Sequence, residues 1–279
     1  MKTYKTLLLL LSFYLLLSCS KDNSSDTSGT PIVDDTPISG QFQKRVLIED
    51  FTGTWCGWCP RVAYAIDQEL LATSKVVPVA IHQKSGSTDP FDFPAAIPLL
   101  QQIQLTGYPT GMLNRTILWS APENNNLSQP KNLTSNNVGL GLAMNSSVSG
   151  GNINLDVKVK FASNYTNLKL VVYILEDKLH ANQTNYTSYL YGSGNVNPLV
   201  NFEEDHVLRS CLTNILGDAI TDTTVSGQTI TKNFSIPVPA NVTNITNMNF
   251  VAFVIGSDNK AINVRLSNPG ENQTFEQNP

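Results

Sequence analysis

The sequence predicts two folded parts, a small α/β domain at residues 41–137 and an all-β sandwich domain at residues 138–279. In the first part, strand-like apolar runs alternate with helical patterns, as in a small α/β domain. In the second part, apolar and polar residues alternate with a period of two, in runs separated by Gly, Ser, Asn and Asp. That pattern is typical of an antiparallel sandwich.

The composition supports a globular chain and excludes one class of partner. The 279 residues are 41% hydrophobic and 14% charged, which is enough apolar material to bury a sizeable core. The formal net charge is −4, and the Lys and Arg residues are scattered. Because phosphate backbones require a basic stripe, we expect no nucleic-acid partner.

The first 18 residues are typical of a signal peptide. Lys2 and Lys5 precede an apolar run over residues 7–17, and this run is shorter than the roughly 20 residues that a membrane-spanning helix needs. The following LLSC resembles a bacterial lipobox, which implies that Cys19 is lipidated; a secretory signal with an incidental cysteine is the alternative. Residues 19–40 are rich in Ser, Asp, Thr and Pro and predict a flexible tether.

The elements of the α/β domain follow from periodicity. The run VLIEDF is apolar and partly β-branched, which predicts a strand, although Glu49 and Asp50 are awkward in it. The next helix has its apolar positions at helical spacing, and Pro78 places the second strand at an edge or bulge. We therefore expect strands at 46–51 and 76–82, helices at 56–74 and 94–104, and a β-hairpin within 106–119 with its tip near Asn114 and Arg115.

The sandwich domain follows a polar, Asn-rich segment at 121–137. Strands are predicted at 152–161, 167–175, 229–238, 248–256 and 261–267. Cys211 has Leu208, Leu212 and Ile215 around it at helical spacing, which predicts a buried free thiol on a helix. The acidic stretch at 203–206 predicts a solvated turn, since consecutive side chains cannot all point at one ion.

Cys56 and Cys59, in TWCGWCP, allow three interpretations. A zinc site needs about four ligands, usually in two close pairs, and this chain has one pair, a lone Cys211 and three scattered His residues. A structural disulfide that closes so small a loop would stabilise the fold weakly. A redox pair is the third interpretation, and the placement of the cysteines favours it.

The start of the predicted helix is suited to redox chemistry. Unpaired backbone N–H groups and the helix dipole favour a thiolate at the first turn, so Cys56 is expected to attack. Cys59 lies three residues further on, where it can resolve a mixed disulfide. Pro60 costs little there, because its missing N–H would have had no intrahelical partner.

This pattern, a strand followed by WCGWC, a helix and GYPT, resembles the thioredoxin-like family. The resemblance covers roughly residues 42–120, where it implies a thioredoxin-like α/β domain, and says nothing of the rest. The strand pattern of the second part predicts an immunoglobulin-like sandwich. The resemblance implies that Pro109 is cis, that Asp50 is a buried acid that assists proton transfer, and that Trp55, Trp58, Tyr108 and Pro109 contact substrate. Trp58 differs from the residues found there in well-known relatives, so oxidant, reductant and isomerase all stay open.

The whole arrangement resembles the twenty-eight-kilodalton outer membrane protein family of Gram-negative lipoproteins, as does HVLR at 206–209. The first hypothesis is a membrane-anchored thiol–disulfide oxidoreductase of the cell envelope that acts on protein thiols or disulfides. The second is a surface-exposed binding protein or adhesin in which the disulfide is inert, with a host or surface ligand. We expect no metal and no cofactor. We expect an outer-membrane location, on the periplasmic or the cell-surface face, and a homodimer is possible.

Overall fold

The structure is a computed structural model, which describes residues 38, 40–86, 88–122, 126–188, 190–192 and 194–278. The predicted signal peptide (1–18), the predicted lipidation site Cys19 and nearly all of the predicted tether (19–40) lie outside the described residues. Among the described residues, no helix has both the length and the apolar character that a membrane crossing would need.

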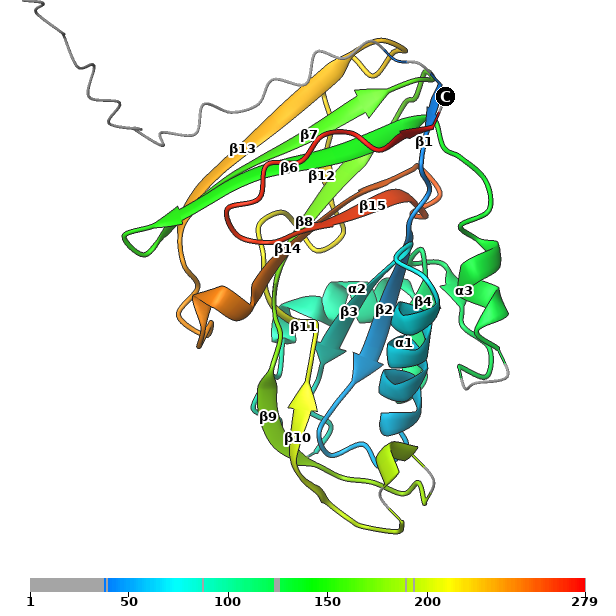
Figure 1. Cartoon of the computed structure of the whole chain (residues 1–279), viewed down its shortest axis with the longest axis vertical. Coiled ribbons are helices and arrows are strands. Elements are labelled where there is room, and N and C mark those ends of the chain that lie inside the picture. The colour runs from blue at the N-terminus through cyan, green and yellow to red at the C-terminus, as the bar shows by residue number, and fades with distance from the viewer. Residues whose placement is uncertain are drawn as a thin grey trace, which may run out of the picture. The chain divides into compact units, whose positions relative to one another are not determined.

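A nine-stranded sheet runs through the described chain (Figure 1). Along the sheet the order is β15 (Ala261–Ser267), β14 (Met248–Ile255), β8 (Lys169–Glu176), β11 (Val207–Cys211), β3 (Val76–His82), β2 (Val46–Thr52), β4 (Thr110–Leu113) and β5 (Ile117–Leu118), with β12 (Asp218–Ala219) against β8. The parallel pairs are β2 with β3 and β3 with β11.

The predicted fold class is wrong. An α/β thioredoxin-like domain followed by an immunoglobulin-like sandwich would keep the strands of the two parts in separate sheets, whereas β11 pairs with β3 on one side and with β8 on the other. Most of the regular structure is β-strand, in several sheets. Local periodicity could not reveal this pairing, because β3 and β11 are far apart in the sequence and the residues around Cys211 have helical spacing. Cys211 is half-buried at the end of a strand, not on a helix.

A second sheet covers one face of β8 and β14. It has the order β13 (Thr229–Pro237), β7 (Asn152–Phe161) and β6 (Leu140–Ser149). Alternate residues of β7, among them Leu155 and Val157, pack against Val172 and Phe250 of the large sheet. Two short pairs complete the strands: β1 (Gln41–Phe42) with β16 (Gln277–Asn278), and β9 (Leu179–Gln183) with β10 (Leu199–Glu204).

The helices are few and short. They are α1 (Pro60–Ala72), α2 (Ile97–Gln102), α3 (Ser128–Asn132) and the 3₁₀ turns η1 (Pro94–Ala96), η2 (Leu190–Gly192) and η3 (Ile245–Asn247). The helix predicted at 56–74 begins only at Pro60, because Cys56–Cys59 form hydrogen-bonded turns instead: the Cys56 N–H donates to the Gly53 carbonyl and the Cys59 N–H to the Cys56 carbonyl. The helix predicted at 94–104 is divided into η1 and α2.

Strand β2 separates two layers of the core. Because side chains alternate across a strand, Val46 and Ile48 contact α1, while Leu47 and Phe51 face α2 and the strands β8 and β14. All seven residues of β2 are buried. The same alternation places the two acids of this strand, Glu49 and Asp50, on opposite faces of the sheet.

Glu49 is neutralised by a buried network that joins distant parts of the chain. Arg115 Nη2 lies 2.9 Å from Glu49 Oε1, and Arg115 Nη1 donates to the Ile215 carbonyl at 2.8 Å. Tyr173 on β8 bonds to both partners through its hydroxyl. Burial opposes the charge of Arg115, but Glu49 and Tyr173 outweigh it and raise the pKa of the guanidinium. Removing one partner would leave an uncompensated buried charge.

Candidate functional site

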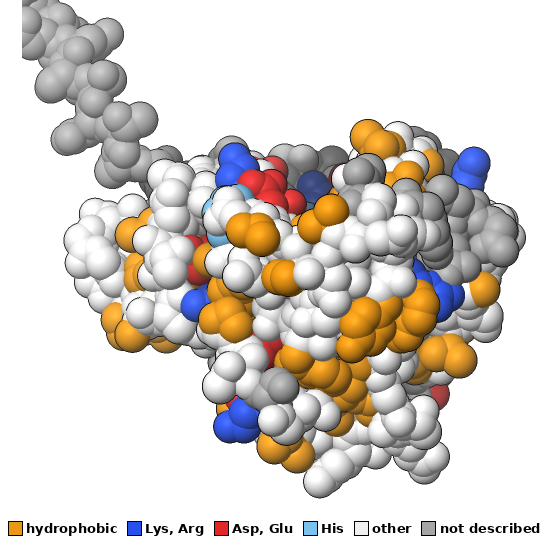
Figure 2. Space-filling view, turned by 90° about the horizontal axis from the view of Figure 1, so that it is seen from below, with side chains coloured by type: hydrophobic (Ala, Val, Ile, Leu, Met, Phe, Trp, Pro, Cys, Tyr) orange, Lys and Arg blue, Asp and Glu red, His pale blue; other side chains and the backbone are white. Residues whose placement is uncertain are grey.

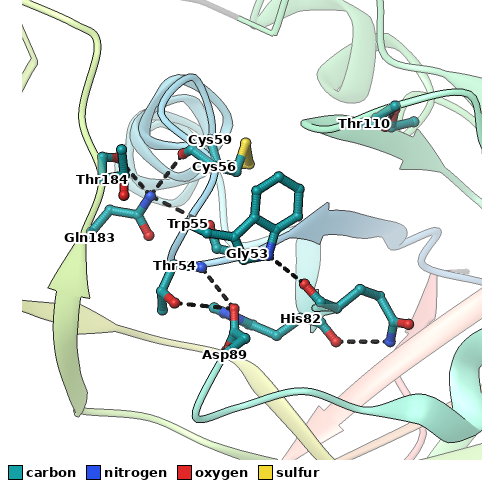
Figure 3. The surroundings of a disulfide bond; sticks show 12 residues. Gly53, Thr54, Trp55, Cys56, Cys59, His82, Asp89, Thr110, Gln183 and Thr184 are labelled. Carbon is teal, nitrogen blue, oxygen red and sulfur yellow. Dashed lines mark hydrogen bonds and ion pairs between the residues drawn. A yellow bond between two sulfur atoms is a disulfide. The ribbon is translucent and has the colours of Figure 1, made fainter. Parts of the chain in front are cut away.

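The two cysteines form a disulfide where α1 begins (Figure 3). Their Cα atoms are 5.4 Å apart. Cys59 is the N-cap of α1, and Cys56 lies in the preceding turn. The expected position of Cys56 in the first turn of the helix is therefore wrong: it is Cys59 whose carbonyl accepts the first hydrogen bonds of α1, from Val62 and Ala63.

Aromatic side chains lie on both sides of the disulfide. The Trp55 and Tyr108 rings meet edge to face with centroids 5.3 Å apart, and Trp58 and Tyr186 do so at 5.8 Å. The Tyr108–Pro109 peptide bond is cis, which confirms that expectation. Trp58 is 47% exposed and Tyr186 58%, whereas Cys56 and Cys59 are only 4% and 2% exposed. The surface beside the disulfide is thus largely aromatic, and the sulfur atoms lie beneath it.

The chain between β9 and β10 covers the turn that carries the cysteines. The side-chain amide of Gln183 donates to the Cys56 carbonyl at 2.9 Å, as Figure 3 shows. The Thr184 and Tyr186 N–H groups donate to the Thr54 and Gly57 carbonyls, each at 2.8 Å. Sequence reasoning missed this contact, since nothing in TNYTSYLYG signals which distant loop it will pair with.

Asp50 is buried on the α1 face of β2. It is 2% exposed, and its Oδ1 finds no hydrogen-bond partner among the described residues. Burial raises the pKa of this carboxyl to about 8, against an opposing effect of His82 and with a further rise from Glu204. The Asp50 carboxyl is therefore protonated near neutral pH. In that state a carboxyl can donate a proton to a thiolate.

Asp50 and Cys59 line one cavity of about 590 Å³. The cavity lies between α1, the face of β2 and β3 that packs against α1, and the β9–β10 segment (residues 179–204). Because side chains alternate across a strand, Asp50, Thr52, Pro78 and Ala80 all point toward α1. The remaining lining residues are Pro60, Ala63, Ile66, Asp67, Gln183, Tyr191, Val196, Leu199, Val200, Asn201, Phe202, Glu203, Glu204, Asp205 and His206. Cys59 thus lines the cavity together with Asp50, whereas Trp55, Trp58 and Tyr108 are not among its lining residues.

His82, at the end of β3, lies beside this cavity. Its Nδ1 is 3.2 Å from Asp89 Oδ2 and its Nε2 is 3.8 Å from Glu204 Oε2. Burial lowers the pKa of His82, but the hydrogen bond to Asp89 and the charges of Glu204, Asp89 and Asp50 outweigh it, so the pKa is raised. Asp89 also accepts from the Thr54 backbone N–H at 2.7 Å, which ties the histidine to the cysteine turn.

Glu204 shows where the prediction of a solvated turn at 203–206 fails. In β10, Glu203 points outward and is half exposed, whereas Glu204 points inward and is 7% exposed. LVNFEE has no period-two alternation, and the register of β10 against β9 shifts between Leu199 and Phe202, so no local pattern signalled the inward position of Glu204. Among the described residues, no group of three or more His, Cys, Asp or Glu side chains is arranged to hold a metal ion.

Comparison with known families identifies the chain. Residues 98–273, well over half of it, match the family of outer membrane protein Omp28. The chain belongs to this family. The Omp28 family is one of outer membrane proteins, and the protein is accordingly located at the outer membrane of the cell envelope. The matched region begins after Cys59, so family membership carries no information on the disulfide.

One solved structure supports the corrected, β-rich fold. HBP35 of Porphyromonas gingivalis is similar with a TM-score of 0.63 and 20% identity, over 86% of this chain and 81% of that one. A protein of Agrobacterium tumefaciens matches with a TM-score of 0.49 and 13% identity, over 86% of this chain and 100% of that one. No curated protein sequence matches. At such identities the likeness to HBP35 concerns the fold alone, and it agrees with the correction of the predicted fold class.

Proposed function

We propose that this Omp28-family protein is a thiol–disulfide oxidoreductase of the cell envelope, anchored through lipid on Cys19, with Cys56 and Cys59 as its redox pair. The observation that carries the proposal is that Cys59 and the protonated Asp50 line the same cavity. A disulfide that only clips a loop has no use for a buried acid beside it. Keeping a carboxyl unpaired there is costly, which points to a role in proton transfer.

The exchange balances as a transfer of two electrons and two protons. A substrate thiolate attacks the Cys56 sulfur, the Cys56–Cys59 bond breaks, and Cys59 leaves as a thiolate that takes a proton from Asp50. A second substrate thiolate then attacks the mixed disulfide, a substrate disulfide forms, and Cys56 leaves as a thiolate and is protonated from solvent. In reverse, the reduced pair reduces a substrate disulfide. The relative stability of the two redox states of the protein decides the direction.

The surroundings of the disulfide favour protein segments as substrates. Trp58 and Tyr186 present large exposed rings beside the disulfide, and rings of this kind bury apolar side chains well. Figure 2, which views the molecule from below, shows apolar side chains gathered on this end with few charged ones among them. A cysteine in an apolar, extended segment suits this surface better than a charged small thiol does.

A second candidate function is supported by the burial of both sulfur-bearing residues. At 4% and 2% exposure, the cysteines are covered by the aromatic rings and the 183–187 segment, so an inert disulfide in a surface binding protein agrees with the geometry as well. In that function the same aromatic surface would bind a host or surface ligand, and Asp50 would have no chemical role.

Trapping experiments separate the two functions. We expect the reduced protein to reduce a disulfide-bonded protein substrate, Cys56→Ser to abolish this, and Cys59→Ser to accumulate a mixed disulfide through Cys56. Cys211→Ser is the matched control, because it removes a cysteine outside the pair, and it should behave as wild type. Absence of mixed disulfide with Cys59→Ser, together with no turnover by the wild type, would exclude the redox function in favour of binding.

A further inference from the structure

The cavity beside Cys59 contains two buried carboxyls from distant parts of the chain. Asp50 comes from β2, and Glu204 comes from β10, more than 150 residues later. Each has an oxygen without a hydrogen-bond partner among the described residues, Oδ1 of Asp50 and Oε1 of Glu204, as has Nε2 of His82 next to them. Buried polar atoms in folded proteins are normally paired, directly or through water, so this group requires an explanation.

Water in the cavity would satisfy the two carboxyl oxygens, because Asp50 and Glu204 both line it, while Nε2 of His82 lies 3.8 Å from Glu204 Oε2. The cavity volume of about 590 Å³ is ample for several water molecules, since one needs only about 15 Å³ of such space. The cavity is partly open, and its lining extends from Cys59 and Asp50 at one end to the half-exposed Glu203, Asp205 and His206 of the β10 end. These carboxyl and imidazole groups can form hydrogen bonds with water along the cavity, from the sulfur atom of Cys59 to the protein surface.

The geometry points to this cavity as the proton outlet of the disulfide exchange, with Glu204 and His82 as positioning residues that set the protonation of Asp50. The inference rests on the proposed redox function. It assigns a role to the β9–β10 segment, which supplies Glu204 and also covers the cysteine turn through Gln183. His82 links both ends, because it lies between Glu204 and Asp89 and Asp89 accepts from the Thr54 backbone.

The proton path has a defined balance. When Cys59 leaves as a thiolate, it takes the proton of Asp50, and the Asp50 carboxylate that remains takes up a proton from bulk solvent, which is relayed through the cavity water. Glu204 destabilises this carboxylate by like charge and His82 stabilises it by opposite charge. The two neighbours therefore shift the pKa of Asp50 in opposite directions.

Other ionisable groups face the cavity and its floor. Asp67 of α1, Tyr191 of η2, Glu203 of β10, and Asp205 and His206 of the turn after β10 line the cavity, while Asp89 of the loop after β3 contacts His82. Asp89 is held by its hydrogen bonds to His82 and Thr54, and Tyr191 bonds to Asp67 through its hydroxyl. Burial raises the pKa of the Tyr191 hydroxyl, and the charges of Asp67, Glu204 and Asp50 raise it further.

The test is a carboxyl titration of the oxidised protein, followed by carbon NMR with ¹³C-labelled aspartate. In wild type the Asp50 resonance should titrate near pH 8. Glu204→Gln should lower this midpoint, and His82→Gln should raise it. Glu203→Gln is the matched control, since it removes the same charge from the neighbouring residue, whose side chain is 52% exposed. It should leave the midpoint close to that of wild type.

Two readouts keep the inference separate from the redox function. A midpoint that stays the same in Glu204→Gln and His82→Gln, or moves in the same direction in both, would overturn the inference even if exchange occurs. If the midpoints move as expected and the wild type exchanges, the alkaline limb of the exchange rate should shift to lower pH in Glu204→Gln. If the midpoints move and the wild type exchanges no thiols, Glu204 and His82 do set the protonation of Asp50, but the proposed redox function is wrong. The cavity is then not the proton outlet of a disulfide exchange.

Discussion

Replacing Asp50 by Asn should stabilise the protein, by an amount that depends on pH. The folded carboxyl has its pKa raised from 3.8 to about 8, so between these values the folded state holds a proton that the unfolded state has released. Stability then falls as pH rises through this window, because the unfolded state binds fewer protons than the folded state. Asn resembles the protonated carboxyl in shape and cannot ionise, so it removes this dependence.

The magnitude follows from the size of the shift. Each pKa unit corresponds to about 1.4 kcal/mol, and the Asp50 side chain belongs to a residue that is only 2% exposed. The gain in unfolding free energy from Asp50→Asn should be negligible below about pH 4, about 4 kcal/mol at about pH 7 and about 6 kcal/mol above about pH 8. Even half of this would be a large part of a typical domain's stability.

Urea unfolding of the oxidised protein at three pH values measures this difference. Glu203→Gln, which removes a half-exposed carboxyl of β10, is the control and should follow the wild-type pH dependence. The reasoning is refuted if Asp50→Asn is no more stable than wild type at about pH 7, or if both proteins lose stability equally between about pH 5 and pH 8. Either result would mean that Asp50 is ionised in the fold.

Two further predictions concern stability and the loop over the disulfide. Arg115→Met should cost about 3–5 kcal/mol of unfolding free energy, because it leaves Glu49 charged and buried. The control, Lys84→Met, removes one partner of an exposed ion pair and should cost under about 1 kcal/mol. A larger loss at Lys84 would contradict this reasoning. Gly57→Ala should abolish the hydrogen-exchange protection of the Tyr186 amide, since the new Cβ would lie 2.3 Å from the Tyr186 ring; retained protection would contradict it. Gly107→Ala, which meets open space, is the control.

Much of the secondary structure could be predicted because it is encoded locally. The strands expected at 76–82, 152–161 and 261–267 occur with the expected bounds, as β3, β7 and β15. The hairpin within 106–119 and the cis bond at Pro109 were also confirmed. Period-two alternation acts over a few residues, so a single sequence contains the information that it needs, whereas the cis bond was implied only by the resemblance to the thioredoxin-like family.

The tertiary arrangement could not be predicted in the same way. Strand β11 joins β3 to β8 by pairing across long sequence separations, which no local pattern records. For the same reason the candidate site was only half visible: Cys56, Cys59 and Asp50 lie close together in the sequence, whereas Gln183 and Glu204 arrive from the β9–β10 segment. His82 is one of three scattered His residues in the sequence, and only the fold brings it to Glu204.

The most direct test of the proposed function is equilibration of the folded wild type with glutathione at graded ratios of oxidised to reduced form. Acid quenching, alkylation and mass spectrometry then count the free thiols contributed by Cys56 and Cys59. The account predicts a reversible transition between disulfide and dithiol, with the fold retained on both sides by circular dichroism. A pair that stays oxidised at every ratio until denaturant is added would contradict the account.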